Sequence, residues 1–145
     1  MSPSARYERG LAKFTEMYGD LARTFLASLE DVAPDLGTYV MEFAFGDIHC
    51  RPELNLKSRE IATIAALTTL GTAGPQLRAH IDGALTVGCN EQEVVEVILQ
   101  MALYAGFPAA LNAMQVAREV FHARSGKKPQ KQKRKTGKIQ QSRSE

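Results

Sequence analysis

The chain has 145 residues, 44% of them hydrophobic, which is enough for one domain with a real core. Its N-terminus lacks the apolar stretch of a signal peptide, and its most apolar segments are too short, or too interrupted by glycine and proline, to span a bilayer. Two isolated cysteines, Cys50 and Cys89, fit a reducing compartment better than a disulfide framework. We therefore expect a cytoplasmic protein without a membrane segment.

The formal net charge of +2 averages two unlike parts of the chain. Residues 126–145 hold eight Lys or Arg and one acidic residue, whereas residues 1–125 hold ten basic and fifteen acidic residues. Because Ile139 is the one sizeable apolar residue of the C-terminal part, burial there cannot offset the entropy of ordering. We expect a folded domain over residues 1–125 and a disordered basic tail over residues 126–145. Its run KQKRK could touch an acidic surface, but without interleaved aromatic residues we do not expect nucleic-acid binding.

Helical spacing dominates the first third of the chain. Apolar residues from Tyr7 to Phe25 recur at alternating intervals of four and three, which predicts an amphipathic helix that Gly19 and Asp20 break in two. A second stripe predicts a helix over residues 35–44, with inward positions at Leu36, Tyr39, Val40 and Phe43. Gly46 and Pro52 mark residues 45–56 as a connector.

Four further helices are predicted from local start and stop signals. The segment from Ser58 is apolar on nearly every side and should be the central, most buried helix. Pro75 suits the first turn of the next helix and Gly88 its C-terminal end. Asn90 and Glu93 have the spacing of a capping box, and Pro108 opens the last helix. Their inward stripes run Val94, Val97, Ile98, Met101 and Tyr104, then Leu111 or Ala110, Ala113, Met114, Ala117, Val120 and Phe121.

These elements predict an all-α bundle. Its many alanines allow close helix approach but bury little area each, so we expect a partner subunit to complete the core and the protein to be a homo-oligomer.

Glu60 and His80 are the polar residues that interrupt apolar helix faces. Glu60, in the first turn of its predicted helix, could be a functional acid or a charge that stabilises the helix N-terminus. His80 shares a face with Leu77 and Ile81, and could be a proton carrier or a buried histidine with one satisfied hydrogen bond. Arg51, Arg59 and Arg78 are candidates to hold an anionic ligand. We expect no metal site, because the three histidines stand on separate predicted elements.

Three segments of the chain, in order FGDIHCRPELNLKSREIATIAALTTLG, QLRAHIDGALTVG and EVVEVILQMALYAGFPAALNAMQVA, together with RYERG near the N-terminus, form a pattern that is specific as a set although each piece is weak. Over roughly residues 40–121 this pattern resembles the carboxymuconolactone decarboxylase family. The resemblance implies an alkylhydroperoxidase D-like helical bundle, a hexamer or trimer, no cofactor, and one of two chemistries.

The first chemistry is decarboxylation of 4-carboxymuconolactone, or a related lactone acid, in the protocatechuate branch of aromatic catabolism (the β-ketoadipate pathway). The second, disulfide-dependent peroxidase (peroxiredoxin) activity, uses a CxxC motif followed four residues later by His. With His80 as that histidine, the cysteine positions fall at Ala73 and Gln76, so the nucleophile is missing. A non-catalytic oligomeric relative remains a third alternative.

The decarboxylase resemblance implies roles for particular residues. Decarboxylation must hold carboxylates, stabilise an oxyanion and supply one proton. His80 would donate the proton or stabilise the oxyanion, and Glu60 would orient His80 or carry the proton. Arg51 and Arg78, with His49 beside the GDI motif, would bind the substrate. Asp82 stands where the decarboxylases carry Arg, which predicts a less positive pocket.

Overall fold

The computed structural model describes residues 4–126, which form helices and short connections with no strand among them. The all-α fold is therefore confirmed for this part of the chain. The predicted basic tail lies, except for its first residue, outside the described residues. No helix in residues 4–126 is long and apolar enough to cross a membrane.

The N-terminal helices are α1 (Ala5–Tyr18) and α2 (Leu21–Ala27). The Ser4 side chain accepts a hydrogen bond from the Tyr7 amide and begins α1. Gly19 then adopts a positive φ of 57°, so the predicted break between the two helices is confirmed.

The predicted connector after residue 44 is wrong in its first part. Helix α3 (Pro34–Tyr39) runs directly into a π-helix, η1 (Val40–His49). The buried positions here are Gly37, Met41 and Phe45, whereas Tyr39 and Phe43, predicted to point inward, are more than 60% exposed. The wider i→i+5 winding of η1 changes which residues share a face, and a stripe read at α-helical spacing therefore fails.

The remaining helices are α4 (Leu56–Leu70), α5 (Gly74–Thr86), α6 (Glu91–Ala105) and α7 (Phe107–Arg124). The capping box at the start of α6 is confirmed. Helix α4 is central, since it packs against α5, α6 and α7, yet it fully buries only the stripe Glu60, Ile64 and Thr68.

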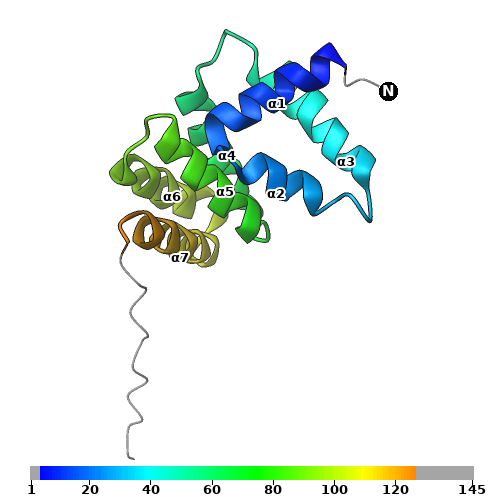
Figure 1. Ribbon diagram of the computed structural model, residues 1–145. Helices are drawn as coiled ribbons and strands as arrows, with labels where there is room; N and C mark the ends of the chain where they lie inside the picture. Colours follow the sequence, from blue (N-terminus) through cyan, green and yellow to red (C-terminus); the bar gives the residue numbers. More distant parts are fainter. Residues whose placement is uncertain (1–3, 127–145) are drawn as a thin grey trace, which may run out of the picture.

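Two hydrophobic clusters divide the molecule. One joins α1, α2 and η1 around Phe14, Met17 and Met41, and the other joins α4 to α7 around Ile64, Ile81 and Ile98. Figure 1 shows α1, α2 and α3 on one side and α5, α6 and α7 on the other, with α4 behind the point where they meet. Helix α1 also packs against α5, which connects the two clusters.

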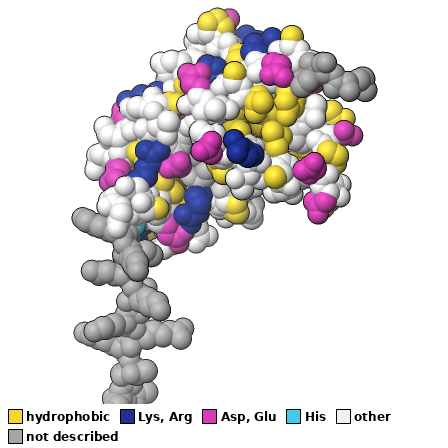
Figure 2. Space-filling model, in the orientation of Figure 1, with side chains coloured by type: hydrophobic (Ala, Val, Ile, Leu, Met, Phe, Trp, Pro, Cys, Tyr) yellow, Lys and Arg dark blue, Asp and Glu magenta, His cyan; other side chains and the backbone are white. Residues whose placement is uncertain are grey.

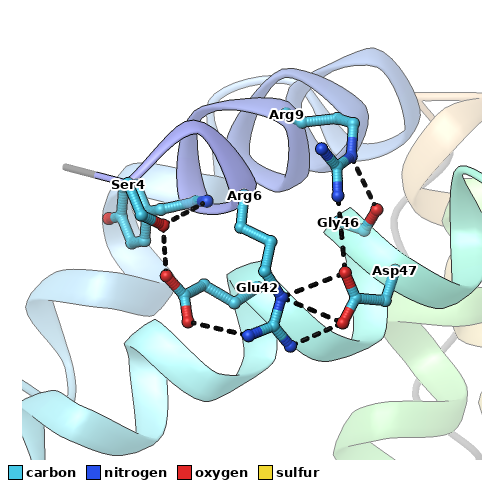
Figure 3. A network of polar contacts seen from close by, with 7 residues as sticks. Ser4, Arg6, Arg9, Glu42, Gly46 and Asp47 are labelled. Carbon is cyan, nitrogen blue, oxygen red and sulfur yellow. Dashed lines mark hydrogen bonds and ion pairs between the residues drawn. The ribbon is translucent and has the colours of Figure 1, made fainter.

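The crossing of α1 and η1 depends on two glycines. A Cβ on Gly10 would lie 1.8 Å from the Met41 carbonyl oxygen, and one on Gly46 would lie 2.7 Å from the Arg6 carbonyl oxygen. Polar contacts surround this crossing (Figure 3): the Arg6 Nε donates to Asp47 at 3.0 Å, and the Arg9 Nε donates to the Gly46 carbonyl at 2.9 Å. The RYERG and FGD segments therefore contact each other and hold α1 against η1.

Several large apolar side chains on α6 and α7 are exposed. They are Leu99 (52%), Leu103 (81%), Tyr104 (75%), Phe107 (75%) and Leu111 (67%). Tyr104 was predicted to point inward and does not, and Ala110 rather than Leu111 is buried. The inner stripe of α6 is confirmed at Val94 and Ile98.

Candidate active site

Four chemically competent side chains meet where the two hydrophobic clusters join. Tyr18 comes from the end of α1, His49 from the end of η1, Glu60 from α4 and His80 from α5. Each element supplies one residue, and Tyr18 and His80 are 62 positions apart in the sequence. The fold, rather than any local motif, therefore assembles this group.

Glu60 is the centre of the group and is fully buried, with 0% exposure. Because the Asn55 side chain caps α4 and the helix begins at Leu56, Glu60 is the fifth residue of the helix and lies beyond the first turn in which it was predicted. It continues the buried stripe of Ile64 and Thr68 and points into the protein. A solvent-exposed charge that merely stabilises a helix N-terminus would not be enclosed in this way.

His80 is hydrogen-bonded to Glu60. Its Nδ1 lies 3.0 Å from Oε2 and 3.3 Å from Oε1 of the carboxylate. Because a carboxylate only accepts hydrogen bonds, we assign the proton of neutral His80 to Nδ1. The other nitrogen, Nε2, then carries the free lone pair, and it has no protein partner within residues 4–126. This is the arrangement by which a carboxylate orients an imidazole for proton transfer.

Tyr18 is the third residue of this hydrogen-bonded group. Its helical spacing predicts only an apolar core position in the first helix, so the sequence did not indicate it as a site residue. Its hydroxyl donates to Glu60 Oε1 at 3.1 Å and lies 2.9 Å from His80 Nδ1. Burial, together with the neighbouring Glu60 charge, raises the pKa of Tyr18 far above its ordinary value. Tyr18 therefore stays a neutral hydrogen-bond donor to Glu60 at any working pH.

His49, the last residue of η1, lies near the same Glu60 carboxylate. Its Nδ1 donates to the Ala44 carbonyl at 2.8 Å, and its Nε2 lies buried, without a hydrogen bond in the described chain, 3.9 Å from Glu60 Oε1. Burial lowers the pKa of His49 below its ordinary value. Its ring also stacks on Phe45, with centroids 4.7 Å apart. His49 thus lies beside Glu60, and it does not line the cavity described in the next paragraph.

A cavity of about 650 Å³ opens beside His80 and Tyr18. Helices α1, α2 and α5 contribute most of its wall, and its apolar lining includes Phe14, Leu21, Phe25, Leu29 and Phe45. This volume is in the range of small-molecule sites. An acid–base pair therefore lies at the edge of an apolar, ligand-sized space.

The two arginines expected to bind substrate lie elsewhere. Arg78 forms an ion pair with Glu119 of α7, and Arg51 lies 3.6 Å from Glu53 with 60% of its side chain exposed. Neither lines the cavity. The charge at Asp82 is also outside it, because its carboxylate accepts from the Arg124 Nε at 2.6 Å.

The cysteines are not part of this site. Cys50 is partly buried and Cys89 is buried, and both are free thiols. Burial raises the pKa of the Cys89 thiol, which disfavours the reactive thiolate. Residues 4–126 contain no group of three His, Cys, Asp or Glu arranged to hold a metal ion.

An all-helical frame thus holds a buried carboxylate, an oriented imidazole and a phenol beside an apolar cavity, a set of groups that can support acid–base chemistry. Residues 34–119 match the model of the carboxymuconolactone decarboxylase family. The chain belongs to this family.

Three relatives extend the comparison. The chain is 37% identical to the 4-carboxymuconolactone decarboxylase of Acinetobacter baylyi, over 83% of this chain and 90% of the relative. It is 34% identical to an uncharacterized 15.0 kDa protein of Paracoccus denitrificans, over 66% of this chain and 72% of the relative. It is 32% identical to a nitrosuccinic acid decarboxylase of Metarhizium robertsii, over 57% of each chain. Two of these relatives are thus named as decarboxylases, and their names give different substrates.

Proposed function

We propose that this protein is a cofactor-free carboxy-lyase that removes CO2 from a lactone acid or a related carboxylic acid. The observation that carries the proposal is the hydrogen bond between the buried Glu60 and His80 at the edge of the cavity. Both named decarboxylases among the relatives support the reaction class. 4-Carboxymuconolactone, of the protocatechuate branch of aromatic catabolism, is the reference substrate.

The reaction needs one proton and a place for developing negative charge. The bond from the substrate's γ-carbon to its carboxylate breaks, CO2 leaves, and the electron pair moves through the alkene onto the lactone carbonyl oxygen. The imidazolium form of His80 then gives its Nε2 proton to the dienolate carbon, which yields the neutral product lactone ring. His80 regains a proton from solvent.

The neighbouring groups support that proton transfer. The Glu60 carboxylate holds Nδ1–H of His80 and stabilises the imidazolium by its opposite charge. The Tyr18 hydroxyl donates to the other carboxylate oxygen and fixes its orientation. The apolar cavity wall favours the loss of a localised carboxylate charge as neutral CO2.

The experiment is ultraviolet-monitored loss of 4-carboxymuconolactone by the wild type, His80→Ala and Glu60→Gln. We expect turnover by the wild type and a loss of about 10²-fold or more in kcat for each variant, the usual size of a general acid–base contribution. Glu96→Gln makes the same chemical change as Glu60→Gln at an exposed position of α6 and should leave kcat unchanged. No turnover of the lactone or related acids by the wild type would refute the activity, and unchanged turnover in both site variants would refute the residue roles.

The exposed apolar face of α6 and α7 supports a further proposal, that copies of the chain associate through it. Its members Leu103, Tyr104 and Phe107 are each at least 75% exposed. Exposed large side chains gathered in this way are typical of subunit interfaces. We propose a homo-oligomer, with the trimer or hexamer as the candidate state.

A further inference from the structure

The cavity beside His80 has no cationic wall. Among the fourteen residues that line it, none is Lys, Arg, Asp or Glu, and His80 supplies the one basic side chain. The other polar lining residues are Tyr18, Thr24, Ser28 and Gln76. A ligand inside this space therefore meets one group that can carry positive charge, at one end.

The arginines near the site in sequence are already occupied. Arg78 is paired with Glu119, and Arg51 lies beside Glu53. Arg59, next to Glu60 in the chain, donates to the carbonyl oxygens of Leu54 and Arg51. A second substrate carboxylate would need one of these guanidinium groups to leave its partners and enter the cavity.

The segment that forms much of the cavity wall is strongly acidic. Residues 19–49 hold six acidic residues and one basic residue, Arg23. Glu42 and Asp47 are paired with Arg6, whereas the other acidic side chains of the segment have no ion pair within residues 4–126: Asp20, Glu30, Asp31 and Asp35. Figure 2 shows an apolar area where α1, α2 and α3 meet, with both acidic and basic side chains at its border. The net negative charge of residues 19–49 disfavours, and does not attract, a second negative charge on an entering ligand.

From this charge pattern we propose, building on the carboxy-lyase function above, that the site prefers a monocarboxylate with an apolar body over a dicarboxylate. The ligand's single carboxylate lies next to His80, and its apolar body packs against Leu21 and Phe25 of α2 and Leu29 just after that helix. The cavity of about 650 Å³ accommodates a body of at least the size of a substituted ring.

The test compares two substrates that differ by one charge. 4-Carboxymuconolactone carries two carboxylates, and its ester on the carboxymethyl side chain keeps the lactone and the departing carboxylate but loses the second charge. We expect kcat/KM to be about tenfold or more higher for the monoester, the effect of about one unfavourable charge contact. An equal or higher kcat/KM for the diacid overturns the proposal.

A charge variant tests the cause. Gln76 lies one turn before His80 on α5 and lines the cavity, so Gln76→Arg adds the missing cation. We expect this variant to lower KM for the diacid about tenfold while KM for the monoester changes little. Gln115→Arg makes the same change on α7, outside the cavity, and serves as the control. Identical behaviour of both variants overturns the electrostatic explanation.

Binding without turnover separates this proposal from the proposed function. Calorimetric titration with cinnamate and 4-carboxycinnamate, a matched monoanion and dianion, reports ligand preference whether or not the lactones react. Absence of turnover of both lactones refutes the lyase function on these substrates. Tighter or equal binding of 4-carboxycinnamate refutes the monocarboxylate preference.

Discussion

Gly83 makes the position of the Tyr18 ring possible. It lies on α5, one turn after His80, and it is buried against the end of α1. A Cβ at Gly83 would lie 2.3 Å from Cε1 of Tyr18 and 3.0 Å from its Cδ1 and Cζ. A normal carbon–carbon contact is about 3.5–4.0 Å, so Gly83→Ala forces the ring to move by more than about 1 Å. The hydroxyl at the end of that ring would then lose its contacts with Glu60 and His80.

The free-energy change has three parts. Overpacking of a core position costs about 1–3 kcal/mol, and the lost hydrogen bond to a charged group costs about 1.5–3 kcal/mol. The better helix propensity of alanine returns about 1 kcal/mol. We therefore expect Gly83→Ala to lower the free energy of unfolding by about 1.5–5 kcal/mol. Because a displacement of about 1 Å in a catalytic group can cost about 10²-fold, kcat should fall by a comparable factor.

The assay is urea unfolding followed by circular dichroism, together with kcat for 4-carboxymuconolactone. Gly74→Ala is the matched control, since Gly74 belongs to the same helix and a Cβ there meets nothing within 4 Å. Tyr18→Phe should remove the same hydroxyl contacts, and the double variant should lose less activity than the two single losses combined. Equal stability and kcat for Gly83→Ala and Gly74→Ala would show that Gly83 does not place Tyr18.

Three further outcomes are expected. Gly10→Ala should lower the free energy of unfolding by about 3 kcal/mol or more in urea titrations, because its Cβ would lie 1.8 Å from a backbone oxygen that cannot move alone. Burial lowers the pKa of His49 below the ordinary value of 6.5, so the folded protein binds fewer protons at this residue than the unfolded protein does. The free energy of unfolding should therefore fall as the pH drops through 6.5. His49→Asn should reduce this pH dependence in unfolding curves measured between about pH 7.5 and about pH 5.5. Leu103→Asp should lower the sedimentation coefficient, and a monomeric wild type would contradict the proposed self-association.

The elements that sequence predicts well are those with local chemical signals. The capping pair Asn90 and Glu93 and the break at Gly19 act within a few residues, so they can be read directly from the sequence. The inward face of residues 35–49 could not be read in this way, because η1 winds as a π-helix and packs against α1, a segment distant in the sequence. The exposed position of Tyr104 likewise depends on surfaces outside one helix.

The residues of the candidate site also divide into those that local sequence signals indicate and those that only the fold brings together. Glu60 and His80 could be singled out because each interrupts an apolar stripe, and the structure places them 3.0 Å apart. Tyr18 could not be predicted as a site residue, because its ring fits the apolar stripe of α1. Only its hydroxyl group takes part in the polar contacts with Glu60 and His80. A useful signal was available in Gly83, a glycine inside a helix where alanine would be more stable. Such a glycine indicates that another side chain approaches the helix closely.

The sequence and the structure give different reasons for the lack of positive charge in the pocket. Asp82 was expected to make the pocket less positive because it stands in place of an Arg. Two residues correspond to about 200° around an α-helix, so Asp82 lies across α5 from His80 and binds Arg124. The pocket nevertheless has no cation, since Arg78 is paired with Glu119 and the acidic segment 19–49 forms much of its wall. The substrate preference proposed above would then depend on the residues that line the cavity and not on Asp82. Gln76→Arg, which adds a cation to that lining from α5, should alter the preference more than the reversal of Asp82.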